Sequence, residues 1–191
     1  MSGLKIIGGT ARGRILKTLK EDDLSIRPLL GRIKKSLFDI LQPKIADADF
    51  LDLYAGTGAV GLEALSRGAR HSVFVEMSPR SLRLIRENAT MLGWTERAEI
   101  HQTDVTRGLS WLDRTFDIIF MGPPYRDAAK QPLTLTTPTL EAIASAGLLN
   151  ADTWLISQHH EKEPITVPPS LSLFRREKYG DTILSFYRLH D

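Results

Sequence analysis

The chain has 191 residues, of which 42% are hydrophobic and 25% charged, and it has no cysteine. This length suits one hydrophobic core and is short for two full domains, and the cysteine count excludes disulfides and thiolate zinc sites. No apolar run is long enough to span a bilayer and no signal-peptide pattern is visible, so we expect a cytoplasmic protein without a membrane partner.

The net charge of +2 is unevenly distributed. Residues 1–44 carry ten Lys and Arg against four Asp and Glu, a net +6, so the remainder carries −4. Clustered Lys and Arg neutralise phosphates and release counterions, which favours contact with a polyanion. A solvated charged arm is the alternative explanation. The candidate contacts to the phosphates of such a polyanion, RNA-binding residues if the polyanion is RNA, are Arg12, Arg14, Arg32, Lys34 and Lys35.

The N-terminal part predicts a β-hairpin over residues 4–20, because apolar runs at 4–7 and 14–19 flank turn-forming glycines. A linker then leads to Pro28, which is typical of the first turn of a helix. Apolar residues recur at helical spacing up to Leu41. We therefore divide the chain into a basic hairpin and linker (1–27) and one compact domain (28–191).

From residue 50 onward, short apolar strands alternate with helices, which predicts an α/β fold with a parallel, doubly wound sheet. The last two strands, joined by a turn at Gly180-Asp181, form a closing hairpin at one side of the sheet. The predicted strands are 50–54, 71–76, 98–104, 116–120, 153–158, 171–178 and 182–189. The predicted helices are 59–67, 79–92 and 138–146.

A glycine motif, Gly56-Thr-Gly-Ala-Val-Gly61, lies between a predicted strand and a helix. This motif fits a dinucleotide site, with a pyrophosphate at the helix start and Glu76 on the ribose. It equally fits a methyltransferase, in which the turn holds the methionine part of S-adenosylmethionine. Asp52 favours the methyltransferase, because it would repel a pyrophosphate and attract an ammonium, directly or through water. A hydrogen-bonded carboxylate at a strand end is the plainer explanation of Asp52.

Two further features lie at the carboxyl ends of strands, where open α/β sheets bind ligands. Asp104 follows the third predicted strand and could accept from an adenine amino group or simply begin a loop. The fourth strand ends in Gly122-Pro-Pro-Tyr125. A Pro-Pro pair stiffens the backbone and leaves carbonyls free, and an aromatic ring beside it suits a flipped-out base with an exocyclic amine. A rigid turn with a packed tyrosine is the alternative.

Together these blocks resemble the RsmD family, bacterial methyltransferases that modify N2 of a guanine in small-subunit (16S) ribosomal RNA. The resemblance rests on residues 51–69, on the Pro-Pro-Tyr turn and on Ile-Ile-Gly-Gly-x-x-Arg-Gly-Arg at 6–14, and extends over nearly the whole chain. It implies a Rossmann-like S-adenosylmethionine methyltransferase fold. In that fold a mostly parallel seven-stranded sheet has one antiparallel strand, and the N-terminal hairpin helps to grip RNA.

The resemblance also implies site residues and partners. The cofactor-binding residues would be Asp52, Tyr54, Gly56, Gly58, Glu76 and Asp104. The target-base turn, with the catalytic role, would be Gly122, Pro123, Pro124 and Tyr125. The expected cofactor is S-adenosyl-L-methionine, and the expected partner of a monomeric, metal-free enzyme is ribosomal RNA or the small ribosomal subunit.

The chain departs from the family pattern at Gly122, where members usually carry Asp or Asn. Such a side chain would accept a hydrogen bond from the guanine amine, and its loss is expected to cost roughly 10²–10³ in rate by analogy with oxyanion-hole deletions. Two alternatives therefore stay open. One is an N6-adenine methyltransferase on DNA or RNA, and the other is a cofactor-binding RNA or ribosome-assembly protein with weak catalysis.

Overall fold

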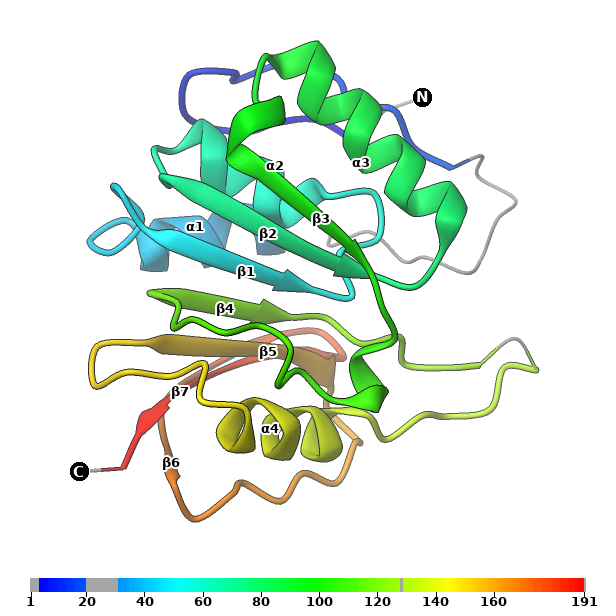
Figure 1. Cartoon of the computed structure of the whole chain (residues 1–191). Helices are drawn as coiled ribbons and strands as arrows, with labels where there is room; N and C mark the ends of the chain where they lie inside the picture. The colour runs from blue at the N-terminus through cyan, green and yellow to red at the C-terminus, as the bar shows by residue number, and fades with distance from the viewer. Residues whose placement is uncertain (1–3, 20–30, 128, 191) are drawn as a thin grey trace.

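The computed structural model describes residues 4–19, 31–127 and 129–190, which form one seven-stranded sheet with helices on both faces (Figure 1). The strand order is β3-β2-β1-β4-β5-β7-β6. The strands are β1 (Asp49–Leu53), β2 (His71–Glu76), β3 (Ala98–Gln102), β4 (Ile118–Met121), β5 (Trp154–His160), β6 (Leu171–Tyr179) and β7 (Thr182–Leu189). The helices are α1 (Gly31–Leu41), α2 (Ala59–Ser66), α3 (Pro79–Leu92) and α4 (Thr136–Ser145), with short 3-10 turns η1 (Thr95–Arg97) and η2 (Val105–Arg107). No helix in these ranges is both long and apolar enough to cross a membrane.

The strand directions confirm the predicted sheet. All neighbouring pairs from β3 through β5 are parallel. β7 runs antiparallel to both β5 and β6. The reversal follows from the short Gly180-Asp181 connection, because a two-residue turn can join only antiparallel strands. Since β7 inserts beside β5, β6 becomes the edge strand.

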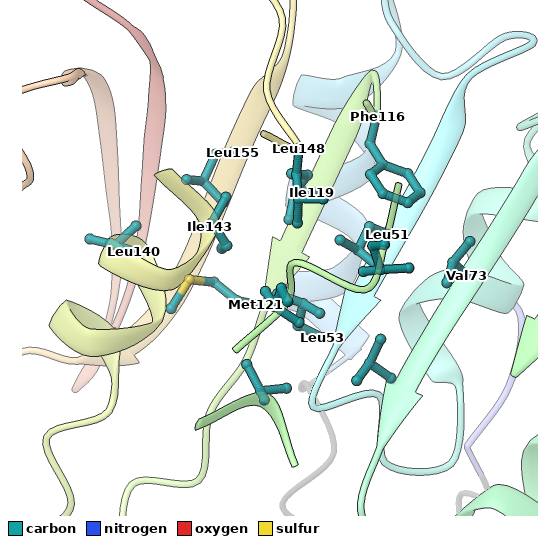
Figure 2. Packing of buried hydrophobic residues seen from close by; sticks show 14 of the residues in the cluster. Leu51, Leu53, Val73, Phe116, Ile119, Met121, Leu140, Ile143, Leu148 and Leu155 are labelled. Atoms are coloured by element: carbon teal, nitrogen blue, oxygen red, sulfur yellow. The ribbon is translucent and has the colours of Figure 1, made fainter. Parts of the chain in front are cut away.

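Alternate residues of the central strands feed two separate cores. On one face, Phe50 and Phe120 pack with buried side chains of α1 and α2. On the other face, Leu51 and Met121 belong to the cluster that contains Leu140 of α4, as Figure 2 shows. Both faces of the sheet centre are therefore covered. Polar side chains of these strands can reach a ligand only where the strands end.

The predicted N-terminal hairpin is confirmed only in part. Antiparallel pairing is limited to one bridge, between Lys5 and Ile15, flanked by a few main-chain hydrogen bonds. Ile6 and Leu16 are buried in a cluster with side chains of α2 and α3. The main-chain N–H of Lys17 donates to the Asn88 side chain of α3 at 2.8 Å. Contacts with these helices, more than a strand ladder, therefore hold the hairpin in place.

Several predicted element boundaries are wrong by a few residues. β3 ends at Gln102, because Asp104 turns the chain by capping η2. α4 begins at Thr136, two residues before the predicted start at residue 138. β5 continues to His160, because its pairing with β7 extends that far. Pro28, the predicted helix start, lies outside the described residues.

A buried ion pair joins α1 to α2. Lys34 Nζ lies 3.0 Å from Glu63 Oε2 and donates to the Lys5 carbonyl at 2.8 Å, and the two charged side chains are 1% and 0% exposed. Glu63 also accepts from the main-chain N–H of Ile7 and from Arg67 Nε, each at 2.9 Å. Desolvation lowers the pKa of Lys34, and the Glu63 carboxylate opposes this shift. The prediction that Lys34 contacts RNA is wrong, because its ammonium is enclosed by protein.

Replacing Glu63 should destabilise the fold strongly. Glu63→Gln leaves the Lys34 charge buried without its counter-charge, which should cost about 3–5 kcal/mol in the free energy of unfolding, measured by urea denaturation. The double variant Lys34→Met/Glu63→Gln should lose less, because no unpaired ammonium remains. Lys35→Met is the control on the same helix, since its pair with Asp39 is exposed and worth under about 1 kcal/mol. A Glu63→Gln chain as stable as this control would contradict the assignment.

Candidate functional site

The loop between β1 and α2 uses its glycines for two purposes. Gly56 and Gly58 have positive φ angles of 55° and 81°, in the left-handed region that favours glycine. Gly61 serves packing instead. A Cβ atom there would come within 2.3 Å of the Phe74 ring. Its absence therefore lets α2 lie close against β2.

Two carboxylate side chains hold this loop in place by accepting main-chain hydrogen bonds. Asp52, on β1 and 1% exposed, accepts from the main-chain N–H of Gly61 at 2.8 Å. Glu76, the last residue of β2, accepts from the N–H of Gly56 through one oxygen and from the N–H of Ser78 through the other, both at 2.8 Å. β1 and β2 are parallel neighbours, so their carboxyl ends bring both acids to the same loop. The predicted grouping of Asp52 and Glu76 is therefore present in the structure.

These hydrogen bonds bear on which ligand charge the loop can accept. The Gly61 N–H belongs to the first turn of α2, where an anion would bind if the amide were available. The Asp52 carboxylate already occupies it. A second negative charge, Glu76, lies at Gly56. This arrangement disfavours a pyrophosphate and suits an ammonium or sulfonium group. Among the described residues there is no group of three or more His, Cys, Asp or Glu side chains that could hold a metal ion.

The buried position of Asp52 changes its ionisation. Burial raises the pKa of Asp52 to about 7, against the opposing effect of the Gly61 hydrogen bond and with a further contribution from the nearby Glu76 charge. At neutral pH the carboxyl group is therefore close to its titration midpoint. A cation bound next to the loop would favour the carboxylate form.

Asp104 and Tyr54 are placed differently from the two loop-bracing acids. Asp104 Oδ1 accepts from the N–H of Thr106 at 2.9 Å and from its hydroxyl at 2.7 Å, and these bonds hold the pKa of Asp104 below its usual range. Asp104 is thus an ionised, half-buried group just beyond β3. The Tyr54 hydroxyl pairs with Thr139 of α4 at 2.7 Å, so only the main chain of Tyr54 belongs to the loop.

The Gly-Pro-Pro-Tyr turn lies directly beside the glycine loop. The N–H of Gly122 donates to the carbonyl of Leu53, the last residue of β1, at 3.4 Å. Pro123 is buried, Pro124 is exposed and Tyr125 is half-buried. The parallel pairing of β1 and β4 therefore brings the predicted cofactor loop and the predicted target-base turn together.

Two residues of β5 complete the turn and were missed by the sequence analysis. Gln158 Nε2 donates to the Tyr125 hydroxyl at 3.0 Å, and the His160 ring meets the Tyr125 ring edge-on, with centroids 5.8 Å apart. His159 points to the opposite face, where it is buried and bonded to Ser185. Alternation at the carboxyl end of a strand was the available signal, since residues two apart share a face.

The remaining predicted RNA contacts are exposed, and the two on the hairpin, Arg12 and Arg14, lie away from the glycine loop. The hairpin turn that carries Arg12 is hydrogen-bonded to Ser66, the last residue of α2. The glycine loop lies at the opposite end of this helix, before its first residue. Arg14 donates to the carbonyl of Met91 near the end of α3 at 3.4 Å. An RNA bound at the Gly-Pro-Pro-Tyr turn would have to extend along α2 and α3 to reach both Arg12 and Arg14. The exposed set is Arg12, Arg14, Arg32 and Lys35.

The reversed strand, the acid-braced glycine loop and the adjoining turn define a Rossmann-like methyltransferase. The chain belongs to the RsmD family, since the family model described as Conserved hypothetical protein 95 matches residues 4–188. It is 35% identical to Ribosomal RNA small subunit methyltransferase D of Escherichia coli (strain K12) over 188 residues, 97% of this chain and 89% of the relative. The solved structure of yhhF from Escherichia coli matches with a TM-score of 0.81 and 29% identity over 98% of each chain. A hypothetical protein of Thermus thermophilus matches with a TM-score of 0.76 and 32% identity over 97% of this chain and 99% of that one.

Asp52→Asn should change the pH dependence of stability. Because the folded-state pKa of Asp52 lies above the unfolded value, the wild type loses stability as pH rises from about 4 to about 7. The Asn amide oxygen still accepts from Gly61 but does not ionise. Relative to wild type, Asp52→Asn should therefore gain in melting temperature between pH 5 and pH 8.

Asp104→Asn is the control of opposite sign for this measurement. Its lowered folded-state pKa contributes stability that is present above the unfolded value and lost at acid pH. Asp104→Asn should therefore be less stable than wild type at neutral pH and equal to it in acid. A constant difference between Asp52→Asn and wild type across the pH range would contradict the burial of an ionisable Asp52.

Proposed function

We propose that the chain is an S-adenosylmethionine-dependent RNA methyltransferase that modifies N2 of a guanine in small-subunit (16S) ribosomal RNA. The observation that carries the proposal is the hydrogen bond from Gly122 N–H to the carbonyl of Leu53, the β1 residue directly before the glycine loop, so that the turn and the loop lie side by side. A cofactor held by the loop and a base held by the turn would then be neighbours. The name of the Escherichia coli relative supports the substrate class.

The acids and glycines suit the parts of the cofactor. Main-chain groups of Gly56 and Gly58 would line the methionine moiety, with the Asp52 charge favouring its ammonium. Each Glu76 oxygen accepts one main-chain hydrogen bond and keeps acceptor capacity for ribose hydroxyls. Asp104 would accept from the adenine amino group. When bound, S-adenosylmethionine would supply a sulfonium-activated methyl group, so that the N2 electron pair forms the C–N bond while the C–S electrons stay on sulfur.

The turn would align the nucleophile. The half-buried Tyr125 ring offers a surface on which the flipped guanine stacks, and the carbonyls of Gly122 and Pro123 face its amine. Pro123 and Pro124 hold these carbonyls rigidly. The amine proton leaves to water once the bond has formed, so alignment contributes more than a strong base.

The basic surface would supply the remaining contacts to RNA. Residues 1–27 form the basic hairpin and linker in this proposal, and 28–191 the methyltransferase domain. Arg12 and Arg14 from the first part, with Arg32 and Lys35 from the second, would contact phosphates. The protein would act in the cytoplasm as a monomer, without a metal or a membrane, on ribosomal RNA or the small subunit.

A second candidate function follows from Gly122, which lacks the acidic or amide side chain usual in the family. It is a cofactor-binding RNA or ribosome-assembly protein with weak catalysis. An N6-adenine methyltransferase remains a third, because the turn serves either amine. The two experiments below separate these functions.

Label from S-adenosylmethionine should appear in unmodified small ribosomal subunits or their naked RNA as N2-methylguanine. Nucleoside analysis after digestion is the measurement. Tyr125→Ala should lose most of the transfer, because the base loses its stacking surface, while Lys162→Ala, an exposed change just after β5, serves as the control. Label in N6-methyladenine would favour the adenine alternative, and cofactor binding without any transfer would favour the assembly protein.

Calorimetry should show S-adenosylmethionine binding that strengthens roughly tenfold between pH 5.5 and pH 7.5, because Asp52 ionises in this range while the ligand's amine stays largely protonated. Asp52→Asn should bind more weakly and lose most of this pH dependence. NAD should give no heat. Tight NAD binding, or a wild-type affinity independent of pH, would sink the role given to Asp52.

A further inference from the structure

Gln158 occupies the space beside the position where the family's acidic or amide side chain is missing. An ideal Cβ built on Gly122 would lie 3.6 Å from Gln158 Oε1 and 3.3 Å from the Phe120 ring. The amide oxygen therefore faces the point from which an Asp or Asn side chain would start. It comes from β5, the strand paired with β4, and not from the turn itself.

The orientation of this amide is fixed by its other end. Gln158 Nε2 donates to the Tyr125 hydroxyl at 3.0 Å, which leaves Oε1 directed toward Gly122. The Tyr125 ring is in turn placed by its edge-on contact with His160. Because one end of the amide donates, its oxygen becomes a better acceptor. The half-buried position limits competition from water.

We propose that Gln158 supplies from β5 the side-chain acceptor that Gly122 lacks, and that Oε1 receives a hydrogen bond from the exocyclic amine of the target base during methyl transfer. This inference rests on the proposed function. In that step, the acceptor orients the nitrogen lone pair toward the methyl carbon and offsets the positive charge that grows on nitrogen. The proton still leaves to water, so Gln158 itself is neither protonated nor consumed.

A neutral amide also fits the charge of this edge. Asp52, Glu76 and Asp104 already place three acidic side chains at the carboxyl ends of neighbouring strands. Another carboxylate would add to their mutual repulsion, whereas an amide offers an acceptor oxygen without a formal charge. Gln158 can thus accept a hydrogen bond with less electrostatic repulsion than a carboxylate at the same place would cause.

The test measures kcat and KM for methyl transfer to the small subunit, with cofactor affinity by calorimetry. Gln158→Ala should lower kcat by about 10²-fold, with cofactor affinity unchanged. Gln158→Glu should retain most of kcat, because a carboxylate still accepts and the Tyr125 hydroxyl can donate to it. Gly122→Asn in the Gln158→Ala background should restore kcat, since the smaller Ala leaves space for an acceptor on the turn.

The controls distinguish this role from a merely structural one. Gln42→Ala changes an exposed glutamine just after α1, before β1 begins, and should leave kcat unchanged. Gln158→Ala with wild-type kcat would overturn the inference and leave the proposed function intact. Equal losses in Gln158→Ala and Gln158→Glu, without rescue by Gly122→Asn, would also overturn it. A wild type that binds cofactor but transfers no methyl group would overturn the proposed function and this inference together.

Discussion

Two buried carboxylates hold the glycine loop, and the rest of the site depends on them. Asp52 accepts a hydrogen bond from Gly61 in the first turn of α2, and Glu76, at the end of β2, accepts one from Gly56. Each satisfies a main-chain amide that would otherwise need a ligand or water. The acids thereby shape the loop and give it a negative charge, which matches a cationic cofactor. Under the proposed function, the side chains that hold the loop would also be the ones that bind the cofactor.

The parallel pairing of β1 with β4 converts this loop into a two-part site. Strands that run in the same direction end at the same edge, so the loop after β1 and the turn after β4 become neighbours. β5 adds Gln158 and His160 at that edge. The turn after β4 thus contacts the main chain of β1 and two side chains of β5, although these segments are distant in sequence.

The N-terminal segment is coupled to the core through a buried charge network. Lys34 on α1 and Glu63 on α2 pair without access to water, and Glu63 also receives the N–H of Ile7. Such a network is costly to bury and costly to break, and it ties the segment to α1 and α2 at once. The exposed arginines of the hairpin, Arg12 and Arg14, are consequently presented on a fixed support.

The sequence by itself determined the element order, the sheet class and the positions of the glycine loop and of the Pro-Pro-Tyr turn at strand ends. These follow from local signals, since apolar periodicity and the spacing of Asp52, Gly56 and Glu76 depend only on nearby residues. Only the tertiary structure decided that Lys34 is buried, because its counter-charge Glu63 lies on another helix. It likewise decided that Gln158 faces Gly122, because that contact exists only once β4 and β5 are paired. Pairing between distant segments leaves no trace in local periodicity.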